Sequence, residues 1–219
     1  MKFSTRFSPV ALSAALLSAL LTLGPAQAVS FGGLNVTPRG AQNLNLETGA
    51  TELPSGGTAT DTKSGLVLTG AKMQLKPNES LTAQGATIKL RRGGTLSANN
   101  VVYDLKNNTV TATGNVTYSD TRMAGLSASQ VVLYVKSGFV VASGSVKAAK
   151  PSLSAERFVF DPNTMQAALS GPYSLKSGGK SFSGAAGQNM LLNFSANMLT
   201  SVKPQPSAVE LGRFAGYLK

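Results

Sequence analysis

The segment LSANNVVYD, residues 96–104, opens a pattern that the chain repeats. Its initial Leu-Ser-Ala triplet returns twice, beginning at Leu126 and at Leu153. Eighteen residues after each of these leucines stands a glycine: Gly114, Gly144 and Gly171. The copies begin 30 and 27 residues apart, whereas the 18-residue spacing is constant. Repeats of this length are typical of stacked units, each of which buries its apolar face against its neighbours. Each copy is therefore predicted to be one structural unit.

The first half of each copy predicts a bent strand. Apolar residues stand 0, 2, 5 and 7 positions after the opening leucine, whereas a regular strand would place them at 0, 2, 4 and 6. One extra residue in the middle, as in a β-bulge or a corner, returns the later side chains to the same face. The residues are Leu96, Ala98, Val101 and Tyr103; Leu126, Ala128, Val131 and Leu133; Leu153, Ala155, Phe158 and Phe160; and, in an earlier copy, Leu81, Ala83, Ala86 and Ile88.

The second half of each copy predicts a straight, half-buried strand, because apolar and polar residues alternate with a period of two. Turn-forming residues separate the halves, at 106–108, 136–138 and 161–164. No helical period occurs between residues 29 and 200. We therefore expect an all-β fold of stacked β-hairpins, a sheet folded over on itself with apolar residues inside and Thr, Ser and Asn outside. The inward set includes Val110, Ala112, Gly114, Val116 and Tyr118; Val140, Ala142, Gly144, Val146 and Ala148; and Ala167, Leu169, Gly171, Tyr173 and Leu175.

The pattern is weaker at both ends of the chain. Leu44 and Leu46 predict one or two short strands within residues 29–64, followed by a turn at 54–57. Leu66, Leu68 and Gly70 resemble a second half, but Lys72 stands where an apolar residue is expected. After Leu175 the repeat decays, as in a capping unit. A last strand is predicted through Leu192, Phe194, Ala196 and Met198, and the tail at 203–219 fits either a helix or a strand.

Residues 1–28 have the three parts of a secretory signal peptide. Lys2 and Arg6 precede an apolar run at 10–23, and Ala26-Gln27-Ala28 forms a cleavage site. A membrane span needs about 20 apolar residues, more than this run provides. We expect export to the periplasm or cell envelope with cleavage after Ala28, a single domain at 29–202 and a tail at 203–219.

Charge and composition limit the possible partners and chemistry. Cleavage removes Lys2 and Arg6 and none of the nine acidic residues, so the net charge falls from +11 to +9. A basic exported protein is expected to bind anionic amphiphiles or polysaccharides. The alternative is that the positive charge only keeps the protein soluble. Export argues against nucleic acid. The chain has no Cys and no His, and its carboxylates are scattered. We expect no disulfide, catalytic site, metal site or cofactor.

One local basic cluster, Lys89, Arg91 and Arg92, can bind the phosphates of an anionic headgroup. The alternative is that these are solvated charges which discourage edge-strand pairing.

The repeats resemble those of a known family. The pattern Leu-x-Ala-x-x-Val-x-Tyr-Asp at 96–104, followed by an alternating strand with Ala-x-Gly-Asn-Val at 112–116, is similar to the OstA-like repeat of periplasmic lipopolysaccharide-transport proteins of the LptA, LptC and LptD type. The resemblance implies a V-shaped β-jellyroll (β-taco) whose interior holds acyl chains. It also implies end-to-end association, with copies of the chain or with partner OstA-like domains, through edge strands. A cleaved signal peptide favours the LptA type.

Two hypotheses remain. The first is a non-enzymatic protein that binds lipopolysaccharide or another anionic amphiphile through the apolar interior. The second is a structural or adhesive β-solenoid whose interior is a closed core. The first predicts the following lipid contacts: Leu96, Ala98, Val101, Tyr103, Val110, Ala112, Val116, Leu126, Val131, Leu133, Val140, Ala142, Val146, Leu153, Phe158, Phe160, Leu169 and Tyr173. Small residues such as Ala112, Ala142, Gly114 and Gly144 are expected to leave room.

Overall fold

The computed structural model describes residues 28–62, 65–90 and 93–218. The predicted signal peptide lies outside these residues except for Ala28, and so do Arg91 and Arg92. The described residues form eighteen strands and one short helix: β1 (Val29–Phe31), β2 (Leu34–Pro38), β3 (Asn43–Leu44), β4 (Thr51–Leu53), β5 (Gly57–Asp61), β6 (Leu66–Gly70), β7 (Lys72–Lys76), β8 (Ser80–Lys89), β9 (Thr95–Asp104), β10 (Thr109–Ser119), β11 (Leu126–Tyr134), β12 (Val140–Ala148), β13 (Ser152–Asp161), β14 (Gln166–Ser170), β15 (Tyr173–Ser177), β16 (Lys180–Gly184), β17 (Asn189–Phe194), β18 (Leu199–Pro204) and α1 (Ala208–Leu211).

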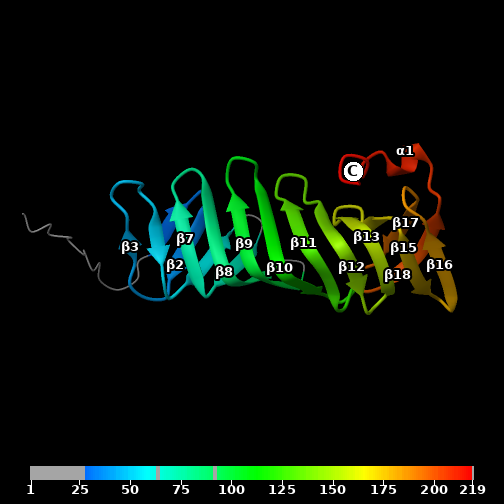
Figure 1. Ribbon diagram of the computed structural model, residues 1–219, viewed down its shortest axis with the longest axis horizontal. Helices are drawn as coiled ribbons and strands as arrows, with labels where there is room; N and C mark the ends of the chain where they lie inside the picture. The colour runs from blue at the N-terminus through cyan, green and yellow to red at the C-terminus, as the bar shows by residue number, and fades with distance from the viewer. Residues whose placement is uncertain (1–27, 63–64, 91–92, 219) are drawn as a thin grey trace, which may run out of the picture.

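All strands pair antiparallel, and the chain is all-β as predicted. The long strands β8 to β13 stack in chain order along the long axis of the molecule (Figure 1). Each of these six strands crosses from one layer to the other at its bend, so that one half lies in each layer. The first layer continues through β7, β4 and β3 at one end and β14, β17 and β18 at the other. The second layer continues through β6, β5, β2 and β1, and through β15 and β16. The sheet is therefore folded over on itself.

Both strands of each hairpin bend, which corrects the predicted straight second strand. On β10, Gly114 and Asn115 have positive φ of 75° and 51°, and the register shifts there against both neighbours. On β12, Gly144 and Ser145 repeat this geometry. In the third copy the chain divides into β14 and β15 around Gly171. A two-residue insertion preserves the alternation of faces, so the period of two hides the bend.

The glycines of the repeat serve these bends and do not leave room in the interior. A Cβ on Gly114 would lie 3.0 Å from Asn99 Cβ, and one on Gly144 would lie 2.7 Å from Ser129 Cβ. Gly144 is exposed. At these positions both the positive φ and the close neighbour require glycine.

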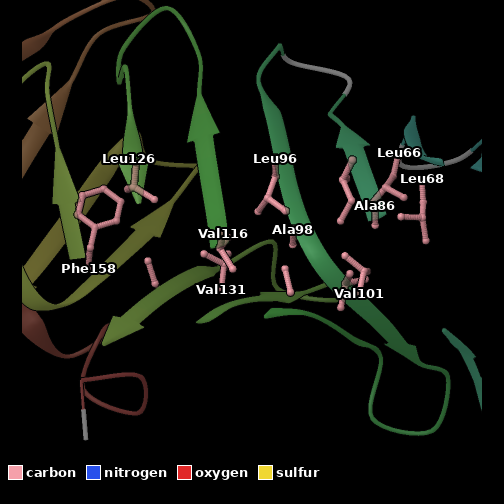
Figure 2. Packing of buried hydrophobic residues seen from close by; sticks show 14 of the residues in the cluster. Leu66, Leu68, Ala86, Leu96, Ala98, Val101, Val116, Leu126, Val131 and Phe158 are labelled. Atoms are coloured by element: carbon pink, nitrogen blue, oxygen red, sulfur yellow. The ribbon is translucent and has the colours of Figure 1, made fainter. Parts of the chain in front are cut away.

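The predicted inward positions of the first halves are confirmed. Leu81, Leu96, Leu126 and Leu153 are all buried, and Val101 is completely so. Their side chains belong to one core cluster that extends along the stack, part of which is drawn in Figure 2. The positions nearest the hairpin turns, Tyr103, Leu133 and Phe160, are only partly buried.

The N-terminal end contains more strands than predicted. Five short strands occupy residues 29–61, and the predicted turn is present at 54–56, while Gly57 already belongs to β5. Leu46, expected on a strand, is 78% exposed in the turn between β3 and β4. Lys72 is exposed because the chain turns at Ala71, after which Met73 and Leu75 face the core. These strands are too short for their alternation to stand out in the sequence.

The C-terminal end also differs from the prediction. The strand predicted through Met198 ends at Phe194, and Ala196 and Met198 lie exposed before β18. β18 extends to Pro204, so the tail begins two residues later than predicted. It contains the short helix α1, capped by Ser207 and Glu210. Within the described ranges, no helix is long and apolar enough to cross a membrane.

The tail folds back along the outside of the first layer, beside β12 and β13 (Figure 1). Phe214 is completely buried there against an outward-facing apolar patch. Tyr217 stacks on Phe139 with ring centroids 4.6 Å apart. The outer face is thus partly apolar, which corrects the prediction that Thr, Ser and Asn cover it. The patch consists of Val141, Val159, Ala168 and Leu191.

Replacing Phe214 with Ala is expected to detach the tail. Phe214 is the only buried residue in the described part of the tail, 205–218, and Phe-to-Ala changes at buried sites cost about 3–5 kcal/mol. Limited proteolysis should then remove residues after 204, and urea unfolding should show lower stability. Val209→Ala is the matched control, because Val209 is 90% exposed in the same segment. Equal protease resistance of the two variants would contradict the assignment.

Candidate ligand groove

An apolar groove of about 380 Å³ lies between the two layers. Its walls are formed by the parts of the long strands that lie next to the hairpin turns, because the two layers move apart with increasing distance from the bends. Figure 2 shows Leu66, Leu96 and Leu126 projecting from their strands into the interior. The volume falls in the range of about 300–1,000 Å³ that is usual for small-molecule sites.

Eleven of the predicted contact residues line this groove. They come from β9 to β13, and most are large aliphatic or aromatic side chains. They are Leu96, Tyr103, Val110, Ala112, Leu126, Val131, Leu133, Val140, Ala142, Phe158 and Phe160.

The other seven predicted contacts are buried but do not line the groove. Ala98, Val101, Val116 and Val146 flank the bends, where the two layers meet and the interior is closed. The remaining three, Leu153, Leu169 and Tyr173, lie toward the C-terminal end of the stack. The sequence period identifies which residues face inward, but it does not show how far apart the layers are.

Several lining residues are absent from the predicted contact set. Leu66, Leu68 and Ile88 follow the repeat pattern, so the period alone could have found them. Leu90, Asp120, Arg122 and Met123 lie in connections, where no period applies. The others are Leu34, Asp61, Gly93, Tyr118, Val135, Gly138, Pro162, Asn163 and Phe194.

The mouth of the groove is narrowed toward the N-terminus by contacts between opposite hairpin turns. The side chain of Leu105 packs on the backbone of Gly32, where an added Cβ would lie 2.4 Å from Leu105 Cδ2. Asp61 and Tyr103 both line this part of the groove. Burial and the nearby charge of Asp61 raise the pKa of Tyr103.

A loop at residues 120–125, between β10 and β11, closes the mouth toward the C-terminus. We call it the crossing loop. The Arg122 guanidinium lies 5.1 Å from the centre of the Phe160 ring, and its Nη1 is 3.3 Å from Met165 Sδ. Thr121 Oγ1 donates a hydrogen bond of 3.1 Å to the carbonyl oxygen of Ala196. The loop therefore contacts two turns of the opposite layer.

The crossing loop is organised by the Asp120 carboxylate. It accepts hydrogen bonds from the backbone N–H of Arg122 at 2.8 Å and of Met123 at 2.7 Å. The Tyr118 hydroxyl donates to it at 2.9 Å, and Arg122 forms an ion pair with it. The side chains of Arg122 and Asp120 are only 10% and 4% exposed. Breaking a buried, hydrogen-bonded ion pair of this kind destabilises the folded protein, because one charge would remain buried without a partner.

The titration of Asp120 follows from these contacts. Burial acts to raise the pKa of Asp120, but the hydrogen bonds from Arg122, Tyr118 and Met123 outweigh burial and lower it. The pKa of Tyr118 is raised, by burial and by the charge of Asp120.

Acidification is expected to weaken the crossing loop through Asp120. Because its folded pKa lies below the unfolded value of about 3.9, its stabilisation is complete above that pH and is lost as the pH falls through the folded pKa. Asp120→Asn should reduce the loss of unfolding free energy below about pH 4, measured by urea unfolding between pH 7 and 2. The exposed Glu156→Gln should leave that part of the curve unchanged. If the unfolding free energy of Asp120→Asn falls with acid as steeply as that of the wild type, Asp120 does not stabilise the loop in this way.

Of the predicted basic cluster, Lys89 is exposed at the end of β8, between the lining residues Ile88 and Leu90. Arg91 and Arg92 lie outside the described residues. On the opposite side of the mouth, the exposed Lys136 stands between the lining residues Val135 and Gly138. The sequence predicts Lys136 only as a turn residue, because its approach to the mouth depends on the folding of the sheet.

Comparisons with known proteins add no assignment. No protein-family model matches the chain, and no match was found among curated proteins. Any function must therefore be inferred from the repeat sequence and from the groove itself.

Proposed function

We propose that the protein is a non-enzymatic lipid-binding or lipid-transport protein of the periplasm, similar to the LptA type. It holds acyl chains of lipopolysaccharide or another anionic envelope amphiphile in the groove. The observation that carries the proposal is an apolar cavity of about 380 Å³ inside a stack of repeats whose sequence resembles the OstA-like pattern. Burial of each methylene there contributes about 0.8 kcal/mol.

We also propose that the fold is the V-shaped β-jellyroll (β-taco) that the sequence resemblance implies. A two-layered sheet with a bend in each repeat fits this architecture. The bends form the closed edge of the V, and the hairpin turns form the two rims of its mouth.

The second candidate is a structural or adhesive β-solenoid that carries nothing. The closed interior at the bends favours it, because Val101 and Val116 pack there as in an ordinary core. The groove favours the first candidate, since an interior packed to normal density leaves no such volume.

Lipid extraction and native mass spectrometry of the purified protein test the proposal. We expect an amphiphile to copurify, or a fluorescent acyl probe to bind the protein after delipidation. If no amphiphile copurifies and no acyl probe binds the folded protein, the β-solenoid candidate replaces it.

End-to-end association is the second part of the proposal. β1 and β3 at one end, and β16 and β18 at the other, each pair with a single neighbour among the described strands. Open edges of this kind accept strands from another chain. Sedimentation velocity should show the mass growing with concentration. Ser30→Pro on β1 should reduce this growth, because proline removes an edge N–H. A monomer at every concentration would refute self-association.

A further inference from the structure

We propose that the ligand is a single-chain anionic amphiphile of about 15 carbons. Its chain lies in the groove and its headgroup lies at the mouth between Lys89 and Lys136. This inference rests on the proposed lipid-binding function and narrows the ligand.

The volume of the groove limits the number of chains. An engineered apolar cavity of about 150 Å³ binds one benzene molecule, which has six carbons. At the same volume per carbon, a groove of about 380 Å³ holds about 15 carbons. That is one long acyl chain. A lipid with several chains would require the layers to separate.

The closures of the mouth oppose such separation. Toward the N-terminus, Leu105 packs on Gly32. Toward the C-terminus, the crossing loop contacts Phe160, Met165 and Ala196. Parting the layers would break these contacts and expose the buried Arg122–Asp120 pair. A single chain can occupy the groove without breaking them.

Between the two closures lies a portal, with Lys89, Leu90 and Gly93 on one side and the turn at 135–139 on the other. Leu90, Gly93, Val135 and Gly138 line the groove at this point. A headgroup that leaves the groove here passes between the two sides of the portal.

The charges around the groove favour an anion at the portal. Lys89 and Lys136 are exposed on its two sides, and the sequence has no acidic residue at 89–95 or 134–140. Of the carboxylates that line the groove, Asp120 lies in the crossing loop and Asp61 lies at the end of β5, two strands from Lys89. Lys89 and Lys136 therefore attract an anionic headgroup to the portal, whereas Asp120 neutralises Arg122 at the crossing loop.

Binding of four amphiphiles to the purified, delipidated protein tests this inference, by calorimetry and native mass spectrometry. The probes are hexadecanoate, octanoate, hexadecanol and a diacyl phosphatidylglycerol. We expect hexadecanoate to bind one-to-one, at least tenfold more tightly than octanoate and than the diacyl lipid. Hexadecanol should bind more weakly than hexadecanoate.

A charge variant separates the headgroup from the chain. The double variant Lys89→Gln/Lys136→Gln should weaken hexadecanoate binding about tenfold and leave hexadecanol binding unchanged. The control Lys147→Gln/Lys176→Gln removes two exposed lysines of the second layer and should change neither.

The outcomes are distinguishable. If the diacyl lipid binds as tightly as hexadecanoate, or if the Lys89/Lys136 variant binds hexadecanoate normally, the single-chain inference is overturned and the lipid-binding function stands. If none of the four probes binds, the proposed function itself fails.

Discussion

Replacing Val116 with Asp is expected to unfold the protein. Val116 is 1% exposed at the bend of β10, where it faces the closed part of the interior. A carboxylate there would be buried without a partner, and the apolar contacts of the valine would be lost. Changes of this kind cost more than about 4 kcal/mol, a large part of a usual stability of about 5–15 kcal/mol. Circular dichroism and urea unfolding would measure the loss.

The neighbouring Thr117→Asp is the matched control for this change. Thr117 is exposed on the opposite face of the same strand, so stability should stay within about 0.5 kcal/mol of the wild type. If Val116→Asp folds with nearly unchanged stability, the layers do not close at the bends.

Replacing Ala112 with Phe is expected to abolish most acyl-chain binding in a protein that still folds. Ala112 is 1% exposed and lines the groove on β10. A ring at this position projects into the groove, so that it fills space and does not create an unpaired polar group. If it excludes about four methylenes, at about 0.8 kcal/mol each, affinity falls about two hundredfold. Displacement of a fluorescent acyl probe would measure this.

Thr111→Phe is the control for the groove-filling variant. Thr111 adjoins Ala112 but faces outward, so the same ring there should leave binding unchanged. Comparable probe affinity in the two variants would show that the acyl chain does not lie in this groove. Because overpacking typically costs 1–3 kcal/mol, the stability of both variants is measured alongside.

The central repeats were predictable because their geometry is local. Apolar offsets of 0, 2, 5 and 7 specify which side chains share a face, and Leu96, Val101 and Leu126 face inward as the offsets require. The turns at 106–108, 136–138 and 161–164 also follow from turn-forming residues. The bend of β10 was not recognised, because a two-residue insertion leaves the period of two intact.

The candidate site was predictable only in part. The period identifies lining residues on the long strands, such as Leu133 and Phe160, but it assigns Val116 and Val146 to the same set, although they are in the closed core. The crossing loop has no period. Its role depends on Arg122 reaching Phe160 and Met165, which the fold brings close from a different hairpin.

The sequence by itself determined the all-β class, the hairpin repeat and the inward face of each long strand, because a strand's alternation is a local property of the chain. Only the tertiary structure decided where the layers separate into a groove, which turns meet across its mouth, and that Phe214 covers the outer patch. These features depend on contacts between residues far apart in the chain. The spacing of side chains along one strand carries no information about the distance to the opposite layer.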